Sequence, residues 1–277
     1  MLPILGTEAI ATGTLTRSAL RWNYTAVHPD VYLQKDVRRN LYTNTVAAWL
    51  WTKRTGVVAG QAAAALYGVQ WIEDSAQIEV IAKHGRRQPG VVVREERICE
   101  DEVRTVGELL VTTPARTGLD LGRHLQRNEA VAVLDALAAV TGVTAIDIWP
   151  LEERYRGARG MPAARAAIAL MDGGARSRRE TALRLLLIDA GLPRPRTSIE
   201  VGDEHWSTTI AIGWDGPKVG IDFEEDDPVV GYRAVQHIER EELFHRLGWF
   251  HIRVRAQHAT RSIVHRARSA LRQRGCR

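Results

Sequence analysis

Residues 218–227 read KVGIDFEEDD, and this stretch decides how the C-terminal part of the chain is interpreted. An apolar strand pattern leads directly into five carboxylates within six positions: Asp222, Glu224, Glu225, Asp226 and Asp227. The chain as a whole is basic, with 38 Lys+Arg against 33 Asp+Glu. Like charges this close repel one another unless a cation, a protonation event or water relieves the repulsion. The crowded acids therefore suggest a site at the end of this strand.

The sequence around this strand predicts an ordered series of helices and strands. The Gly-Gly break in MDGGARS, residues 171–177, indicates a domain boundary near residue 173. After it we expect a helix, a meander of three strands, a helix, a strand and a basic helix. Their predicted ranges are 178–190, 197–201, 207–213, 217–224, 232–247, 250–255 and 259–274. This order predicts an α/β sandwich over residues 173–277.

The N-terminal region has a different pattern. Two short helices are expected within 3–22, the second capped by Thr14 or Thr16, followed by a hairpin over 24–34. Two helices and then a hairpin is the order of a winged helix-turn-helix. A long helix over 37–54, closed by Gly56, comes next. We expect an α/β (α+β) protein with a winged-helix-like region (1–76), a mixed α/β middle region (77–172) and the C-terminal sandwich (173–277).

Composition and charge narrow the class of protein. Without a long apolar run, a basic leader or a cysteine framework, the chain is expected to be cytoplasmic, with no membrane partner. Arginine carries most of the positive charge, and residues 253–277 hold eight arginines and no acid. Such a segment suits phosphate contacts, which favours DNA as a partner; a GC-rich genome would also account for the ratio of arginine to lysine. The candidate DNA-binding residues are Arg17, Arg21, Arg86, Arg87, Arg253, Arg255 and Arg266.

The acids also predict a metal site. Strand alternation places Asp222 and Glu224 on one face, and Glu180 lies in the first turn of the preceding helix. Hard divalent ions prefer carboxylate oxygens and keep waters that can attack a phosphodiester. The acids would thus hold Mg²⁺ or Mn²⁺. Two structural alternatives stay open: Asp222 and Glu224 form surface ion pairs with Arg253 and Arg255, and Glu180 only complements its helix terminus.

Several ordered motifs carry a resemblance that spans nearly the whole chain. RRETALRLLL, GLPRPRTSIEV, KVGIDFE and HRLGWFHIRVR resemble very-short-patch repair endonucleases, a branch of the PD-(D/E)XK nuclease superfamily. HPDVYLQKD, GVVAGQAAAALYG and LLVTTPARTGLDLG resemble the antitoxin-type domain of the AbiEi abortive-infection family. The resemblance implies a restriction-endonuclease-like α/β/α sandwich in which Glu180, Asp222 and Glu224 are catalytic and hold the metal.

This chain departs from the nuclease pattern in two places. Ala211 stands where the middle strand usually supplies an Asp, and Asp226, Asp227 and Pro228 stand where the family often has a His. The stretch Asp222-Phe223-Glu224-Glu225 matches a usual Glu-Tyr-Asp-Gly, keeping two acids but exchanging their lengths. Three alternative functions therefore stay open. The first is a DNA-binding protein with a degenerate nuclease-like domain, and the second is an active Mg²⁺-dependent DNA endonuclease. The third is an antitoxin and transcriptional regulator. In the antitoxin reading, the acidic segment 224–227 mimics phosphate toward a cognate toxin protein.

Overall fold

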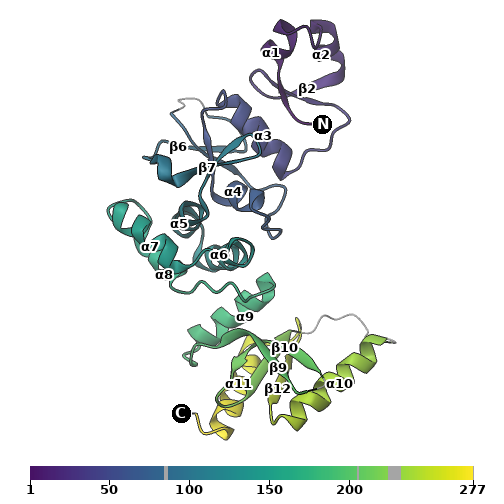
Figure 1. Ribbon diagram of the computed structural model, residues 1–277, viewed down its shortest axis with the longest axis vertical. Coiled ribbons are helices and arrows are strands. Elements are labelled where there is room, and N and C mark those ends of the chain that lie inside the picture. Colours follow the sequence, from purple (N-terminus) through teal and green to yellow (C-terminus); the bar gives the residue numbers. More distant parts are fainter. Residues whose placement is uncertain (84–86, 205, 224–231, 277) are drawn as a thin grey trace. The chain divides into compact units, whose positions relative to one another are not determined.

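The structure is a computed structural model that describes residues 1–83, 87–204, 206–223 and 232–276 (Figure 1). The chain divides into two compact units, Met1–Met171 and Asp172–Arg277, and each is described by itself. Both units mix helices and strands, so the α/β class is confirmed at this level. The expected boundary near residue 173 lies close to this division, whereas the expected boundary at residue 76 falls inside the first unit.

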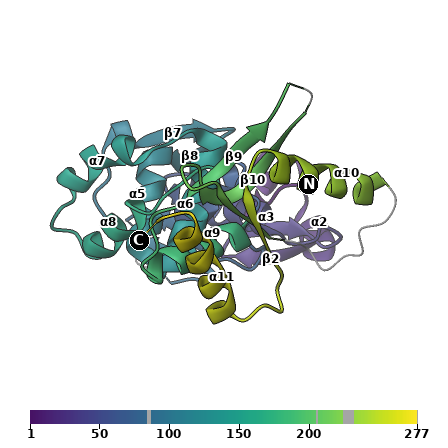
Figure 2. The same cartoon turned by 90° about the horizontal axis from the view of Figure 1, so that it is seen from below.

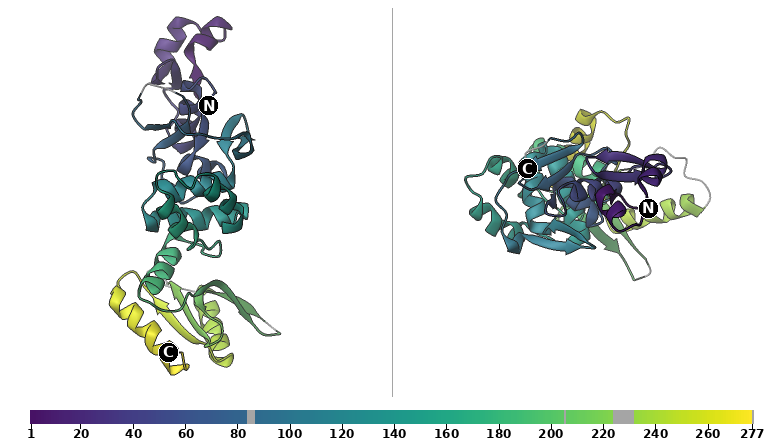
Figure 3. Two further views of the ribbon diagram at one scale, coloured as in Figure 1. Left: turned by 90° about the vertical axis from the view of Figure 1, so that its left-hand side faces the viewer. Right: turned by 90° about the horizontal axis from the view of Figure 1, so that it is seen from above.

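The first unit begins with a small sheet and two short helices, drawn in purple in Figure 3. In chain order the elements are β1 (Ile4–Leu5), α1 (Gly6–Ala11), α2 (Arg17–Asn23), β2 (Tyr24–His28) and β3 (Val31–Gln34). Thr16 caps α2, because its side chain accepts a hydrogen bond from the Ala19 amide at 3.1 Å. The strands are antiparallel in the order β1-β3-β2. The helices and hairpin are as predicted; β1 is too short to show in the sequence pattern.

The helix α3 (Leu41–Trp51) is shorter than its predicted range of 37–54. Asn40 caps its start through the Thr43 amide at 2.8 Å. The prediction that Gly56 closes the helix was wrong. Thr52 is the C-cap, and Lys53 and Arg54 take the left-handed conformation, with φ of 53° and 62°. Gly56 lies beyond this turn.

A five-stranded mixed sheet forms the centre of the first unit. Its strands are β4 (Val57–Ala59), β5 (Ile78–Ile81), β6 (Val91–Arg94), β7 (Val103–Val106) and β8 (Leu109–Thr112), in the order β6-β5-β4-β8-β7. Because β4 pairs with β5, the expected boundary at residue 76 would cut through one sheet. The helices that follow α3 in this unit are α4 (Gly60–Leu66), α5 (Pro114–His124), α6 (Arg127–Thr141), α7 (Ala145–Arg154) and α8 (Met161–Ile168).

The second unit follows its predicted order closely. Its elements are α9 (Arg178–Asp189), β9 (Arg196–Gly202), β10 (Ser207–Trp214), β11 (Val219–Phe223), α10 (Tyr232–Arg246), β12 (Phe250–Val254) and α11 (Thr260–Gln273). The strand order is β12-β11-β10-β9, with β11 and β12 parallel and the other pairs antiparallel. The antiparallel β9 and β10 are visible side by side in Figure 2.

Helices cover both faces of this four-stranded sheet (Figure 1). One core cluster joins α9 and α11 to the sheet through residues such as Leu187, Ile221 and Ala267. A second cluster joins α10 to the sheet through Phe244 and Ile210. The second unit is therefore a layered α/β arrangement, and the end of β11 lies where α9 and α10 both reach the sheet.

Among the described helices, none has by itself the length and apolar character that crossing a membrane requires. The pair α6 and α7, bent by 119°, meets those criteria only when taken together.

Candidate functional site

A polar pocket of about 350 Å³ lies at the end of β11 in the second unit. Its walls come from α9, β10, β11, α10 and the segment before α9. The lining residues are Arg176, Glu180, Thr208, Thr209, Ala211, Asp222, Phe223 and Arg240. The structure therefore brings together Glu180 and Asp222, two of the three predicted catalytic acids, beside Ala211. Glu224, the third, lies outside the described residues, as does the rest of the acidic segment 224–227.

Asp222 ends the apolar run of β11 and is almost completely buried, with 6% of its surface exposed. One carboxylate oxygen accepts a hydrogen bond from the Ala211 amide at 2.7 Å. The other accepts from Arg240 at 2.6 Å and faces His251 Nε2 at 2.7 Å. Three donors thus satisfy the carboxylate from within the protein. The alternative of surface ion pairs with Arg253 and Arg255 does not describe Asp222, which is buried and pairs with Arg240 and His251, although Arg253 is its register partner on β12.

His251 links two carboxylates. Its Nε2 faces Asp222 at 2.7 Å, and its Nδ1 lies 2.8 Å from an oxygen of Glu241. The Phe244 ring lies against the imidazole, with the two centroids 4.7 Å apart. Each ring nitrogen lies within hydrogen-bonding distance of a carboxylate oxygen, so the imidazole bridges Asp222 and Glu241.

The surroundings of Asp222 set the protonation of its carboxyl. Burial raises the pKa of Asp222, but the His251 hydrogen bond, the Arg240 charge and the Ala211 amide together lower it below the ordinary value of 3.8. A lowered pKa means that ionised Asp222 stabilises the fold above pH 3.8, and that this stability is lost as the pH falls through the folded-state pKa.

We expect the variant Asp222→Asn to be less stable than the wild type by about 2 kcal/mol near neutral pH, because Arg240 and His251 lose their anionic partner. The difference is expected to shrink as the pH falls from 3.8 toward the lower pKa of the folded state, where the wild-type carboxyl also becomes protonated. Urea unfolding at pH 7 and pH 3 measures both values. Asp215→Asn, which removes an exposed pair with Arg196, is the matched control and is expected to change little. A difference that stays constant or grows toward acid pH would contradict this account.

The described residues of the pocket do not fit a divalent metal. Both oxygens of Asp222 already accept hydrogen bonds, and a guanidinium occupies one of them. One oxygen of Glu180 accepts from the Arg176 amide at 2.7 Å. Within the described ranges, the groups of three ligating side chains that converge within 4.8 Å include neither Glu180 nor Asp222. The predicted Mg²⁺ or Mn²⁺ thus lacks a described set of free ligands.

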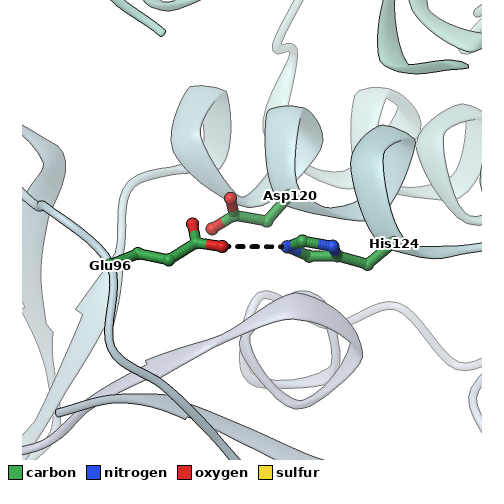
Figure 4. A group of neighbouring side chains, drawn as sticks. All are labelled: Glu96, Asp120 and His124. Carbon is green, nitrogen blue, oxygen red and sulfur yellow. Dashed lines mark ion pairs between the residues drawn. The ribbon is translucent and has the colours of Figure 1, made fainter. Parts of the chain in front are cut away.

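One of those converging groups, Glu96, Asp120 and His124, lies between α5 and the segment after β6 (Figure 4). Arginine side chains already neutralise its acids. Arg116 donates to Asp120 at 3.0 Å, and Arg123 donates to Glu96 at 2.7 Å and to Asp120 at 3.2 Å. The second group, Cys99, Asp101 and Glu102, is bridged in the same way by Arg154.

We give the name Arg116 cluster to the half-buried Glu96 together with the buried Glu102, Arg116, Asp120 and Arg123. Burial raises the pKa of Asp120 to about 6 even though two guanidinium groups contact it. Burial likewise lowers the pKa of the neighbouring His124 to about 4. The cluster includes Arg116 and Asp120 of the motif LLVTTPARTGLDLG, and it explains that motif as a structural ion network rather than as a metal centre.

The predicted DNA-binding arginines fall into two groups, one in each unit. In the first unit Arg17 and Arg21 are exposed on α2 and Arg87 is exposed before β6, whereas Arg86 lies outside the described residues. In the second unit Arg253 and Arg255 are exposed at the end of β12. Arg266 is half-buried and donates to the Arg253 carbonyl at 3.1 Å, so part of its donor capacity is used within the fold.

Sequence reasoning missed Arg240, His251 and Glu241. HRLGWFHIRVR contains His251 two positions before Arg253, which places both on one face of β12. A parallel β12 beside β11 would have put that face next to Asp222. The alternation of side chains along β12 could therefore have identified His251 as a neighbour of Asp222. That step requires knowing that β12 pairs in parallel with β11.

Two proteins of Mycobacterium tuberculosis are similar to this chain: the uncharacterized protein Rv2248 of strain H37Rv and the uncharacterized protein MT2308 of strain CDC 1551 / Oshkosh. Each is 32% identical over 165 residues, which make up 58% of this chain and 60% of the relative. The chain thus matches less than two thirds of their length. No protein-family model matches the chain, and no solved structure gives a significant match. The comparisons place the chain beside mycobacterial relatives whose names state no activity.

Proposed function

We propose that the protein binds DNA and that its second unit is a nuclease-like domain that does not cleave. The observation that carries this proposal is the pocket in which Glu180, Ala211 and Asp222 meet. These are the three described positions at which the resemblance to PD-(D/E)XK nucleases expects acids. Two acids are retained, the third is an alanine, and Asp222 is held by an arginine and a histidine.

The electrostatics of the pocket support binding without metal-dependent cleavage. A divalent ion beside Asp222 would have to displace the Arg240 hydrogen bond and would then lie close to that guanidinium. It would also find no carboxylate at Ala211. The carboxylate missing at Ala211 would have supplied one coordination bond and one negative charge to balance the positive charge of the ion. The pocket instead presents Arg176 and Arg240 beside two threonine hydroxyl groups, and such donors can contact a phosphate directly.

The layers of the second unit support a restriction-endonuclease-like sandwich. A helix precedes a three-stranded antiparallel meander, and a crossover helix then leads to a parallel fourth strand. The basic helix α11 ends this unit, and Arg261, Arg268 and Arg272 on it are exposed. A one-signed surface of this kind suits a nucleic-acid backbone.

The first elements of the chain support a winged-helix reading of the N-terminal region. Two short helices precede a hairpin, and β1 completes a sheet in the order β1-β3-β2. The second helix of a helix-turn-helix enters the major groove. In this chain that helix is α2, on which Arg17 and Arg21 are exposed and the neighbouring Trp22 is 69% exposed.

An active endonuclease is the second candidate, because Glu180 and Asp222 do share one pocket. We expect supercoiled plasmid to remain intact when incubated with the protein in Mg²⁺, Mn²⁺ or EDTA. The matched control is the double variant Asp222→Asn/Glu224→Gln. Metal-dependent nicking by the wild type that disappears in this variant would overturn the non-cleaving proposal and establish the endonuclease. Nicking that persists in the variant would point to a contaminating nuclease, and repurification would have to abolish it.

A further inference from the structure

The helix α2 has one exposed face that carries no acid. This face, which we call the α2 face, consists of Arg17, Ser18, Arg21 and Trp22. The spacing i, i+1, i+4 and i+5 gathers these side chains on one side of a helix. Leu20 lies on the other side, where it is buried with 7% exposed, and this apolar anchor fixes which side of α2 faces solvent.

The positive charge of the α2 face is available to a partner. Among the described residues, no hydrogen bond or ion pair holds the guanidinium group of Arg17 or Arg21. Lys35 adds an exposed cation beside the end of the helix, because its backbone amide donates to the Asn23 carbonyl at 2.9 Å. Guanidinium groups one helical turn apart can contact the phosphates of a nucleic-acid backbone.

The carboxylates of the surrounding elements do not neutralise the two arginines. Glu8 of α1 pairs with Arg54 through two hydrogen bonds of 2.6 and 2.7 Å. Asp30 accepts a hydrogen bond of 2.9 Å from a backbone amide at the start of α1. Asp36 is exposed and offsets the charge of its neighbour Lys35. The positive charge that remains for a partner is therefore that of the α2 face itself.

Trp22 presents an indole ring at the C-terminal end of the α2 face, with 69% of the residue exposed. A single exposed apolar side chain is common and needs no explanation by itself. Trp149 on α7 is 62% exposed in the same unit, but the exposed acids Asp147 and Glu153 stand on its helix. The cationic surroundings of Trp22, with Arg21 directly before it, are therefore what separates the two rings.

An exposed indole among arginines suits a base that is not stacked in a duplex. In duplex DNA each base is covered by its neighbours, and the grooves present only the edges of the bases. Pulling a base out of the stack costs free energy, and the cost is least where the base is already single-stranded. Such a base can stack on an aromatic ring, whatever its identity, while basic side chains hold the backbone.

We infer that the α2 face binds DNA that carries unpaired bases, with Arg17 and Arg21 on phosphates and the Trp22 ring stacked on one unpaired base. The inference rests on the proposed DNA binding and names the kind of DNA. Because the contact uses the face of the base rather than its edge, it selects unpaired DNA with little preference for sequence.

The test compares two fluorescently labelled DNA hairpins that share one stem and carry a single-stranded tail of equal length. One tail is made of thymidines and the other of abasic sites, so the two DNAs have the same charge and differ only in the bases. Fluorescence anisotropy with the full-length chain measures both affinities. We expect the thymidine tail to bind about tenfold more tightly, in line with the stacking of one base on an aromatic side chain.

Three variants assign the preference to the indole ring. In Trp22→Ala the affinities for the two tails are expected to become equal, whereas Trp22→Phe is expected to keep part of the preference because it keeps an aromatic ring. Trp149→Ala, the matched control, is expected to keep all of it. A preference that survives undiminished in Trp22→Ala would overturn the inference, because the contact with the bases would then lie elsewhere.

The wild-type comparison decides the inference without any variant. Equal affinity for the two tails would overturn it and leave DNA binding in place, whereas the absence of binding to either hairpin would overturn both proposals. An exposed tryptophan beside arginines is also found on surfaces that bind anionic lipids. Sedimentation with phosphatidylserine vesicles that Trp22→Ala abolishes, together with equal affinity for the two tails, would assign the α2 face to a membrane instead.

Discussion

Replacing Arg116 by methionine is expected to lower the free energy of unfolding of the first unit by about 3–5 kcal/mol, the usual result of removing one partner from a buried ion network. The Arg116 side chain is completely buried, with 0% exposed. It donates to Asp120 at 3.0 Å and 3.1 Å and pairs with the buried Glu102. Methionine fills similar volume but leaves both carboxylates without this cation. Urea unfolding of the full-length chain measures the loss.

Two further variants separate the ion network from packing. Arg156→Met replaces an exposed arginine of the same unit and is expected to change stability by less than about 0.5 kcal/mol. In the double variant Arg116→Met/Asp120→Asn, one stranded charge is removed, so part of the stability is expected to return. If Arg116→Met lowers the free energy of unfolding by less than about 1 kcal/mol, the Arg116 cation does not stabilise the Arg116 cluster in the way that its contacts indicate.

The elements of the second unit could be predicted from sequence because their signals are local. MDGGARS breaks the chain, Ser177 caps α9, and apolar alternation marks β9 and β10. In the first unit the two-residue strand β1 was not predicted. A strand of two residues has no period, and the order of the five-stranded sheet depends on pairings between distant segments.

The candidate site could be predicted only in part. Glu180, Ala211 and Asp222 were identified through the nuclease resemblance, and the structure brings them to one pocket. The partners of Asp222 could not be found in the same way. Arg240 reaches it from α10 and His251 from a parallel strand, so both depend on tertiary packing. The sequence also could not show that LLVTTPARTGLDLG forms a buried ion network.

The second prediction with a large expected effect concerns how the affinity for DNA depends on salt concentration. We expect the affinity for duplex DNA to fall about 10³-fold between 50 and 200 mM salt, because about six arginines would each neutralise one phosphate and release counterions. The described candidates for these contacts are Arg17, Arg21, Arg87, Arg253, Arg255 and Arg266. Fluorescence anisotropy of a labelled duplex measures the affinity at each salt concentration.

Substitutions on α2 test whether this helix contributes to DNA binding. The double variant Arg17→Ala/Arg21→Ala is expected to reduce the slope of log affinity against log salt by about 2, since two phosphate contacts are lost. Arg156→Ala, also exposed and in the same unit, is the matched control and is expected to leave the slope unchanged. An unchanged slope in the α2 variant would remove that helix from the binding surface.

The most direct test of the central claim is the same anisotropy titration carried out in EDTA. Because Arg240 and His251 already satisfy the Asp222 carboxylate, DNA binding should need no divalent ion. The account predicts binding in EDTA at low salt, with an affinity that falls steeply as salt is added. Binding that appears only when Mg²⁺ is supplied, or an affinity that stays unchanged from low to high salt, would contradict it.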